Sequence, residues 1–101
     1  MSNDNSDQGK PGNVPPRESL IEYPSHFPIK VMGSMQDGFA EAIVTLVQGF
    51  DPDFHAGKME MRPSSKGNYL GLTVTVWVTS REQLDDLYRA LTSHPMVKVV
   101  L

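Results

Sequence analysis

The stretch YLGLTVTVWV, residues 69–78, decides the fold of this chain. Its aliphatic side chains recur at every second position, which is the period of a β-strand with one buried face. The face predicted to be buried carries Leu70, Leu72, Val74, Val76 and Val78. The other face carries Tyr69, Gly71, Thr73, Thr75 and Trp77. This alternation predicts a strand of an antiparallel sheet that is packed on one side and open on the other.

Two segments before this strand alternate in the same way. The first is FPIKV at residues 27–31, and Gly33 is predicted to end it. The second is residues 58–62, where methionines alternate with charged side chains. Turn-forming residues follow it directly, so a hairpin is predicted to join it to residues 69–78.

Two helices are predicted between the strands. Residues 39–50 carry apolar side chains at three- and four-residue spacings, which predicts an amphipathic helix of about four turns. Ser34 is its expected N-cap. Ser80 and Gln83 form an S-x-x-Q capping box, which starts a second helix that stops before Pro95.

A last strand, MVKVVL at residues 96–101, completes the order β-α-β-β-α-β. Right-handed crossovers place both helices on one face of the sheet. The predicted fold class is therefore α+β: a ferredoxin-like α/β plait, whose four-stranded antiparallel sheet has the order 4-1-3-2. The predicted core consists of Phe27, Ile29, Val31, Ile43, Leu46, Val47, Leu70, Leu72, Val74, Val76, Leu84, Leu87, Leu91, Val97 and Val99.

The length and composition allow one small domain. The chain has 101 residues, of which 39% are hydrophobic and 21% charged. Val14 is the only large apolar residue between positions 2 and 19, so this segment has too little to bury for stable folding. A disordered polar tail is predicted over residues 1–19, and a single folded domain over residues 20–101.

Charge and cysteine content exclude several classes of protein. A formal net charge of −3 provides no cationic field, which disfavours binding to nucleic acid. The chain has no cysteine, so disulfides, thiolate nucleophiles and cysteine-based metal sites are excluded. A membrane span and a secretory signal are not predicted, because no apolar run is long enough and the N-terminus is polar. A cytoplasmic protein is expected.

Catalytic and metal-binding patterns are missing from the sequence. His26, His55 and His94 lie in separate loop-like segments, without the short-spaced pair that usually anchors a metal site. Ser64 and Ser65 have no adjacent base to activate them. The sequence therefore predicts a protein that is not an enzyme, with no metal and no cofactor.

The turn from Ser64 to Asn68 allows two interpretations. As a hairpin turn, Gly67 supplies a positive φ and Asn68 tolerates it. As an anion site, backbone N–H groups, the hydroxyls of Ser64 and Ser65 and the Lys66 ammonium surround a small oxyanion. The hairpin turn is favoured, although it would not by itself require two serines and a lysine.

A second candidate surface is the face of the sheet opposite the helices. Strand parity places on it Lys30, Met32, Glu60, Arg62, Thr73, Thr75, Trp77 and Lys98. Because the fourth, first and third strands are neighbours, Lys98 and Lys30 are predicted to lie side by side. A solvated face is one interpretation. An exposed Trp often marks an interface, so binding through Lys30, Arg62, Trp77 and Lys98 is the other.

Three stretches resemble the YbeD-like family of small bacterial proteins. They are FPIKVMG at residues 27–33, RPSSKGNY at residues 62–69 and VKVVL at residues 97–101. The resemblance covers residues 20–101 and implies a ferredoxin-like domain similar to ACT regulatory domains, in a family without an assigned biochemical role. ACT domains commonly bind amino acids near the first strand-to-helix turn. Here that turn, residues 32–37, has no charged clamp for a ligand carboxylate.

Two functional hypotheses follow. The leading one is a non-enzymatic binding or regulatory module that contacts another protein, or a second copy of itself, through the open sheet face or the Ser64–Asn68 turn. The alternative is an ACT-like sensor, in which a small anionic metabolite lies near Ser64, Ser65 and Lys66. Neither hypothesis involves a membrane or a nucleic acid.

Overall fold

Seven elements follow one another along the chain: the six that the sequence predicts, in the predicted order, and one short 3-10 turn. The computed structural model describes residues 22–101, so the predicted tail over residues 1–19 lies outside the described residues. In chain order the elements are β2 (Ser25–Ser34), α2 (Phe39–Gln48), the 3-10 turn η1 (Ala56–Lys58), β3 (Met59–Pro63), β4 (Tyr69–Val78), α3 (Arg81–Ser93) and β5 (Val97–Val100).

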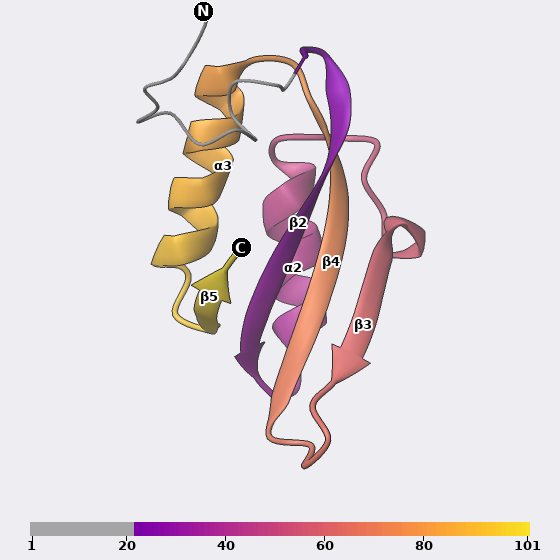
Figure 1. The fold of residues 1–101 in the computed structure, drawn as a ribbon, viewed down its shortest axis with the longest axis vertical. Coiled ribbons are helices and arrows are strands. Elements are labelled where there is room, and N and C mark those ends of the chain that lie inside the picture. The colour runs from indigo at the N-terminus through magenta and orange to yellow at the C-terminus, as the bar shows by residue number, and fades with distance from the viewer. Residues whose placement is uncertain (1–21) are drawn as a thin grey trace, which may run out of the picture.

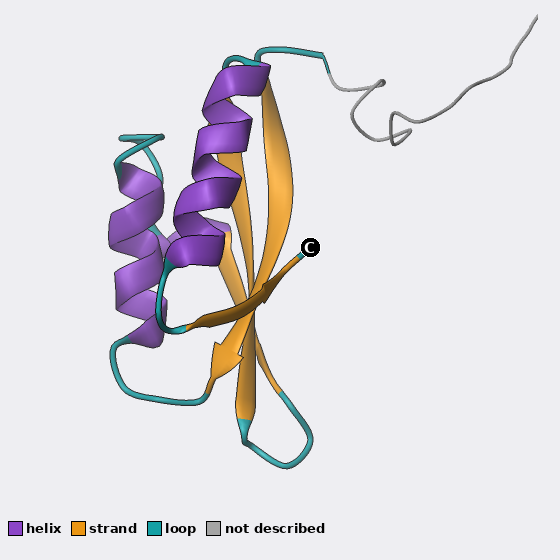
Figure 2. Cartoon of the chain, turned by 90° about the vertical axis from the view of Figure 1, so that its left-hand side faces the viewer, coloured by secondary structure: helices purple, strands orange, loops and turns teal. Residues whose placement is uncertain are grey.

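The four strands form one antiparallel sheet in the order β3-β4-β2-β5. Figure 1 shows β4 between β2 and β3. When the strands are numbered by their order in the chain and read from the β5 edge, this is the predicted order 4-1-3-2. Both helices lie on the same face of the sheet, as the side view in Figure 2 shows. The ferredoxin-like α+β fold is thus confirmed.

The core fills the layer between the sheet and the helices. The β2–β4 register pairs Ile29 with Val74 and Val31 with Leu72, and all four side chains are buried. Phe39, Phe54 and Val78 are buried in addition to the predicted residues, whereas the predicted core residues Leu46 and Val97 are only partly buried. The face of β4 predicted to be buried is buried along its whole length. One-sided burial therefore sets the register of the central strands.

The start of α2 differs from the prediction. Strand β2 continues through Gly33 to Ser34, and α2 begins at Phe39 after Gly38, whose φ is +86°. Ser34 is not the N-cap, and α2 has 10 residues rather than about four turns. Gly33 is required by packing instead, because a Cβ there would lie 2.3 Å from the Met96 carbonyl oxygen.

The register of β5 corrects two further predictions. Val31 pairs with Val100 and Met32 with Val99, but Gly33 pairs with Val97, so the register shifts between Met32 and Gly33. Lys98 is the extra residue of this bulge. Val99 consequently lies opposite Met32, on the open side, and is not a core residue.

The predicted start of α3 is confirmed. The Gln83 N–H donates to the Ser80 hydroxyl oxygen at 3.1 Å, and the Gln83 side-chain oxygen accepts a bond from the Thr79 N–H at 2.6 Å. The Gln83 side-chain amide donates to the Phe50 carbonyl at 2.8 Å. This last bond joins the start of α3 to the segment after α2.

Candidate interaction surface on the open sheet face

The face of the sheet opposite the helices is uncovered within residues 22–101. Figure 1 looks onto this face, with α2 behind the strands, and Figure 2 shows the sheet and the helices from the side. A sheet face of this kind is exposed to solvent or to a partner. The side chains that it presents therefore decide what the surface can bind.

Pairing of the strands orders these side chains in rows across the sheet. Thr73 of β4 pairs with Glu60 of β3 on one side and with Lys30 of β2 on the other. Lys30 in turn exchanges two backbone hydrogen bonds with Leu101, of 3.3 and 2.8 Å. One row thus reads Glu60, Thr73, Lys30, Leu101.

The neighbouring row contains a glycine at its centre. Gly71 pairs with Arg62 on β3 and with Met32 on β2, and Met32 pairs with Val99. The two rows border a depression with a volume of about 550 Å³, called here the open-face groove. Residues lining it include Lys30, Met32, Glu60, Arg62, Tyr69, Gly71, Thr73, Val99 and Leu101.

Large apolar side chains are exposed on this face. Five of them are between 39% and 62% exposed: Met32, Tyr69, Trp77, Val99 and Leu101. Met35, directly after β2, is also exposed. A concentration of large apolar groups on one uncovered surface is characteristic of an interaction site, whereas scattered single ones are ordinary.

Charged groups on the same face have no partner within the described part of the chain. Lys30, Glu60 and Arg62 make no ion pair or side-chain hydrogen bond among residues 22–101. Glu60 and Lys30 are separated by β4, which places their strands about 10 Å apart. These three charges therefore remain available to a ligand or partner.

A buried carboxylate, that of Asp51, lies at the end of the sheet near Trp77. Asp51 is only 3% exposed. It accepts hydrogen bonds from the N–H of Asp53 at 3.1 Å and from the N–H of Trp77 at 3.0 Å. β3 pairs with β4 only as far as Val74, so β3 offers no acceptor to the N–H of Trp77. The Asp51 carboxylate accepts this N–H instead. Asp51 thereby fixes the segment after α2 against the sheet.

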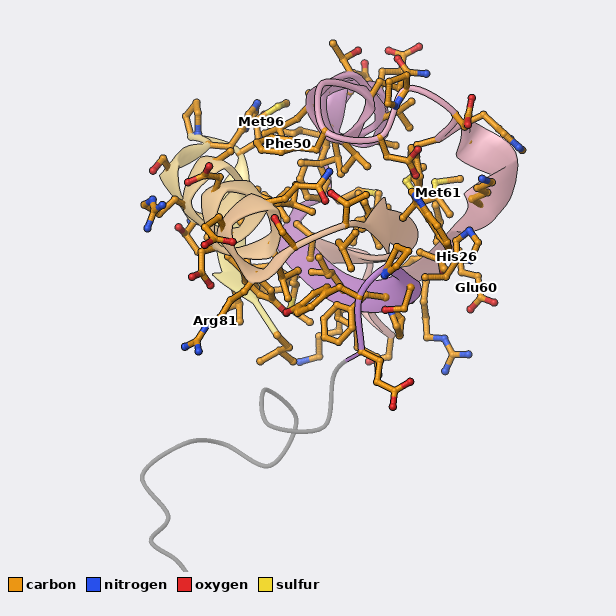
Figure 3. All side chains as sticks on the ribbon, turned by 90° about the horizontal axis from the view of Figure 1, so that it is seen from above. His26, Phe50, Glu60, Met61, Arg81 and Met96 are labelled. Carbon is orange, nitrogen blue, oxygen red and sulfur yellow. The ribbon has the colours of Figure 1, made fainter. Side chains whose placement is uncertain are left out.

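Trp77 and His26 lie together at this end. Their ring centroids are 4.7 Å apart and the rings are tilted by 57°. His26 and Glu60 also line one shallow depression of about 350 Å³, and Figure 3 shows the two side chains close together at one side of the molecule. The surface is therefore continuous from Trp77 down to the open-face groove.

The Ser64–Asn68 turn is a hairpin connection, as the favoured interpretation predicts. Gly67 has a φ of +76°, and its N–H donates to the Ser64 carbonyl at 2.9 Å. The Ser64 hydroxyl oxygen accepts a bond from the Tyr69 N–H at 3.1 Å. The Asn68 carbonyl accepts a bond from the Met35 N–H at 2.9 Å. In its own bond the Ser64 hydroxyl oxygen accepts and keeps its O–H to donate, so the anion site formed by Ser64, Ser65 and Lys66 stays a prediction.

The predicted binding residues are only partly brought together. Lys30 and Arg62 both line the open-face groove, and Trp77 lies on the same face nearer its other end. The prediction that Lys98 lies beside Lys30 was wrong, because the bulge in β5 places Leu101 there. Val99, predicted to be in the core, and Leu101 could not be assigned to this face from the sequence, since MVKVVL is apolar at nearly every position and does not reveal a bulge.

Each histidine has a local structural contact. The His55 imidazole accepts a bond from the Gly57 N–H, and that of His94 from the Met96 N–H. No group of three or more His, Cys, Asp or Glu residues suited to a metal ion occurs among residues 22–101. In the same range, no helix is long and apolar enough to cross a membrane.

The fold and its uncovered face define a small ferredoxin-like α+β protein. The chain belongs to the family described as "Protein of unknown function (DUF493)", whose model matches residues 18–101. It is 83% identical over 88 residues to a UPF0250 protein of Ralstonia nicotianae, covering 87% of this chain and 91% of that protein. These matches confirm the resemblance to the YbeD-like family of small bacterial proteins.

A second relative and a solved structure agree with this assignment. A UPF0250 protein of Bordetella pertussis is 64% identical over 89 residues, which are 88% of this chain and 98% of that protein. The solution structure of protein HP0495 from H. pylori has a TM-score of 0.68, covers 90% of this chain and 98% of its own, and is 16% identical. At that identity, the H. pylori protein supports the fold alone.

Proposed function

We propose that this protein is a non-enzymatic binding module of the bacterial cytoplasm, which contacts another protein chain through its open sheet face. One observation carries the proposal: five large apolar side chains are exposed on the uncovered face, and four of them line a groove of about 550 Å³. Burying such side chains releases about 25 cal/mol for each Å² of apolar surface. This is the main driving force of protein association.

The charges on the face support a protein partner over a small apolar ligand. Lys30, Glu60 and Arg62 surround the groove and carry both signs. An apolar centre bordered by charges of mixed sign is the usual composition of a protein interface. A site for a small molecule would more often be deep and enclosed, with few polar groups.

A binding role requires no reaction centre at the groove. Catalysis by a nucleophile or an acid–base pair commonly uses two reactive side chains within hydrogen-bond reach. The titratable groups at the groove belong to different rows or are separated by β4. The output of the module is therefore the contact itself, through which it regulates its partner.

A photo-crosslinking amino acid at position 73 tests this function in the native host. Thr73 lies at the centre of the open face, between Glu60 and Lys30. The control carries the same amino acid at Glu82, an exposed position of α3 in the helix layer. We expect a crosslinked protein species from position 73 and none from position 82. If position 73 yields no crosslinked species, the proposed function is wrong.

A further inference from the structure

We propose, resting on the function above, that the partner on the open face is a second copy of this chain, packed sheet against sheet. The proposal comes from the row that contains Glu60, Thr73 and Lys30. In this row an acid and a base flank a central uncharged residue at equal strand spacing. Such a row is complementary to its own rotated copy.

A two-fold axis that runs along β4, between the two sheets, exchanges the two sides of the row. The axis keeps Thr73 at the centre, since Thr73 belongs to β4 itself. It places Glu60 of each copy over Lys30 of the other, so two identical ion pairs form. This is the isologous contact that closed dimers use. It also neutralises two charges that have no partner among residues 22–101.

The aromatic side chains of the face fit the same axis. Tyr69 and Trp77 both belong to β4 and to its open side. An axis along β4 therefore brings each of them to its own counterpart. Arg62, one row below Glu60, comes over Met32, where its aliphatic stem packs on the thioether side chain. Aligned packing, in which the strand directions of two sheets stay within about 30° of each other, accommodates this contact.

A different axis is less favourable. If it lay between β4 and β2, all four strands would overlap, but Glu60 would face Leu101 and Thr73 would face Lys30. A carboxylate buried against an apolar side chain loses hydration without compensation. Charge pairing therefore selects the axis along β4, with three strands in the overlap and β5 at the rim.

The overlap also sets the expected strength of the dimer. β4 is ten residues long but β3 only five, so the overlapping strands cover about 320 Å² on each copy, or about 600 Å² in total. This is smaller than a standard specific interface and lies in the range of weak, transient contacts. A reversible dimer that dissociates on dilution is therefore expected.

Charge exchange is the test, measured by sedimentation equilibrium over a range of concentrations. Lys30→Glu and Glu60→Lys each place like charges opposite each other twice, so each should weaken the dimer about tenfold. The double variant K30E/E60K restores opposite charges and should recover the wild-type affinity. An equimolar mixture of the two single variants should form a mixed dimer. The control Glu82→Lys, which makes the same charge change on α3, should change nothing.

A crosslink reports the axis directly. The chain has no cysteine, so Thr73→Cys introduces its only thiol. A short bismaleimide should join two copies at position 73, whereas Glu82→Cys should give no dimer. Circular dichroism confirms that every variant is folded before its affinity is compared.

Two outcomes would overturn the proposal. The first is a wild-type chain that stays monomeric at millimolar concentration; the second is a dimer that Lys30→Glu and Glu60→Lys leave unchanged. If position 73 then crosslinks in the host to a protein of different mass, the proposed function stands and only the second copy is wrong. If position 73 gives no adduct at all, both proposals fall.

Discussion

Replacement of Gly33 by alanine should strongly destabilise the fold, although alanine is the smallest possible change. A Cβ at this position would lie 2.3 Å from the Met96 carbonyl oxygen and 2.6 Å from the Phe39 ring. The Phe39 ring is fully buried, and the Met96 carbonyl belongs to the backbone that leads into β5. Neither group has free space to move into, so β5 or α2 must shift away from β2.

The size of the effect follows from overpacking. Extra methyl groups in a packed core cost about 1–3 kcal/mol, and a contact under 3.0 Å with backbone belongs at the upper end. For a domain of this size, about 2–3 kcal/mol lowers the thermal midpoint by roughly 10–20 °C. Gly71→Ala is the matched control, because its Cβ would meet only the Arg62 carbonyl, at 3.5 Å. This control should be neutral or stabilising by about 0.5 kcal/mol.

Urea unfolding of both variants, followed by circular dichroism, measures the two free energies. Gly33→Ala should be less stable than Gly71→Ala by about 2 kcal/mol or more. Equal midpoints for the two variants would refute it, and would mean that β5 is not packed against β2 as described.

Five other substitutions test three separate parts of the structure by the same unfolding assay. Val74→Asp should prevent folding, because it buries an unpaired charge under the helices, whereas Thr73→Asp on the open face should leave a folded protein; equal damage would mean that the sheet is covered on both faces. Asp51→Ala should cost about 1–3 kcal/mol, since it leaves a strand N–H without an acceptor; an unchanged midpoint would contradict that role. Ser64→Ala should cost about 1 kcal/mol and Ser65→Ala nothing measurable, because only the Ser64 hydroxyl accepts a backbone bond; the reverse order would be evidence for an anion site at the turn.

The sequence predicts best the elements where burial and local signals agree. In residues 69–78 the alternation is complete, so a slip by one residue would expose every aliphatic side chain. At α3, the Ser80 cap and the apolar stripe indicate the same start. These are the elements that the structure reproduces without correction.

The junctions are predicted less well, because a residue there can have more than one physical reason. From the sequence, Gly33 indicates the end of a strand and Ser34 a helix cap. The glycine is instead required by close approach of Phe39 and Met96, a contact between segments far apart in the chain. No local pattern encodes such a contact.

The candidate surface is predicted in outline only. Parity places Lys30 and Arg62 on the open face correctly, since both belong to strands of clear alternation. The predicted contribution of β5 to this face is wrong. Val97, Val99, Val100 and Leu101 are all apolar, so the predicted register and the observed one each bury some of them. The bulge that decides between the registers depends on the pairing with β2.

Gly71 gives an independent reason to regard the open face as functional. Its backbone requires no positive φ, and a Cβ would have ordinary room beside the Arg62 carbonyl. The fold therefore does not need glycine at this position. A glycine within a strand costs about 0.5–1 kcal/mol relative to alanine.

Gly71 lies in the same groove as Met32 and Tyr69. The apolar side chains of these two residues are exposed, so they do not gain the free energy that burial would provide. Two features that each lower the stability of the isolated chain lie next to each other on its uncovered face. Stability alone explains neither, but a partner that fills the groove explains both. Gly71→Ala should accordingly leave the fold intact and weaken the dimer, since the methyl group occupies space that the partner requires. If Gly71→Ala associates as tightly as the wild type, the groove is not the centre of the interface.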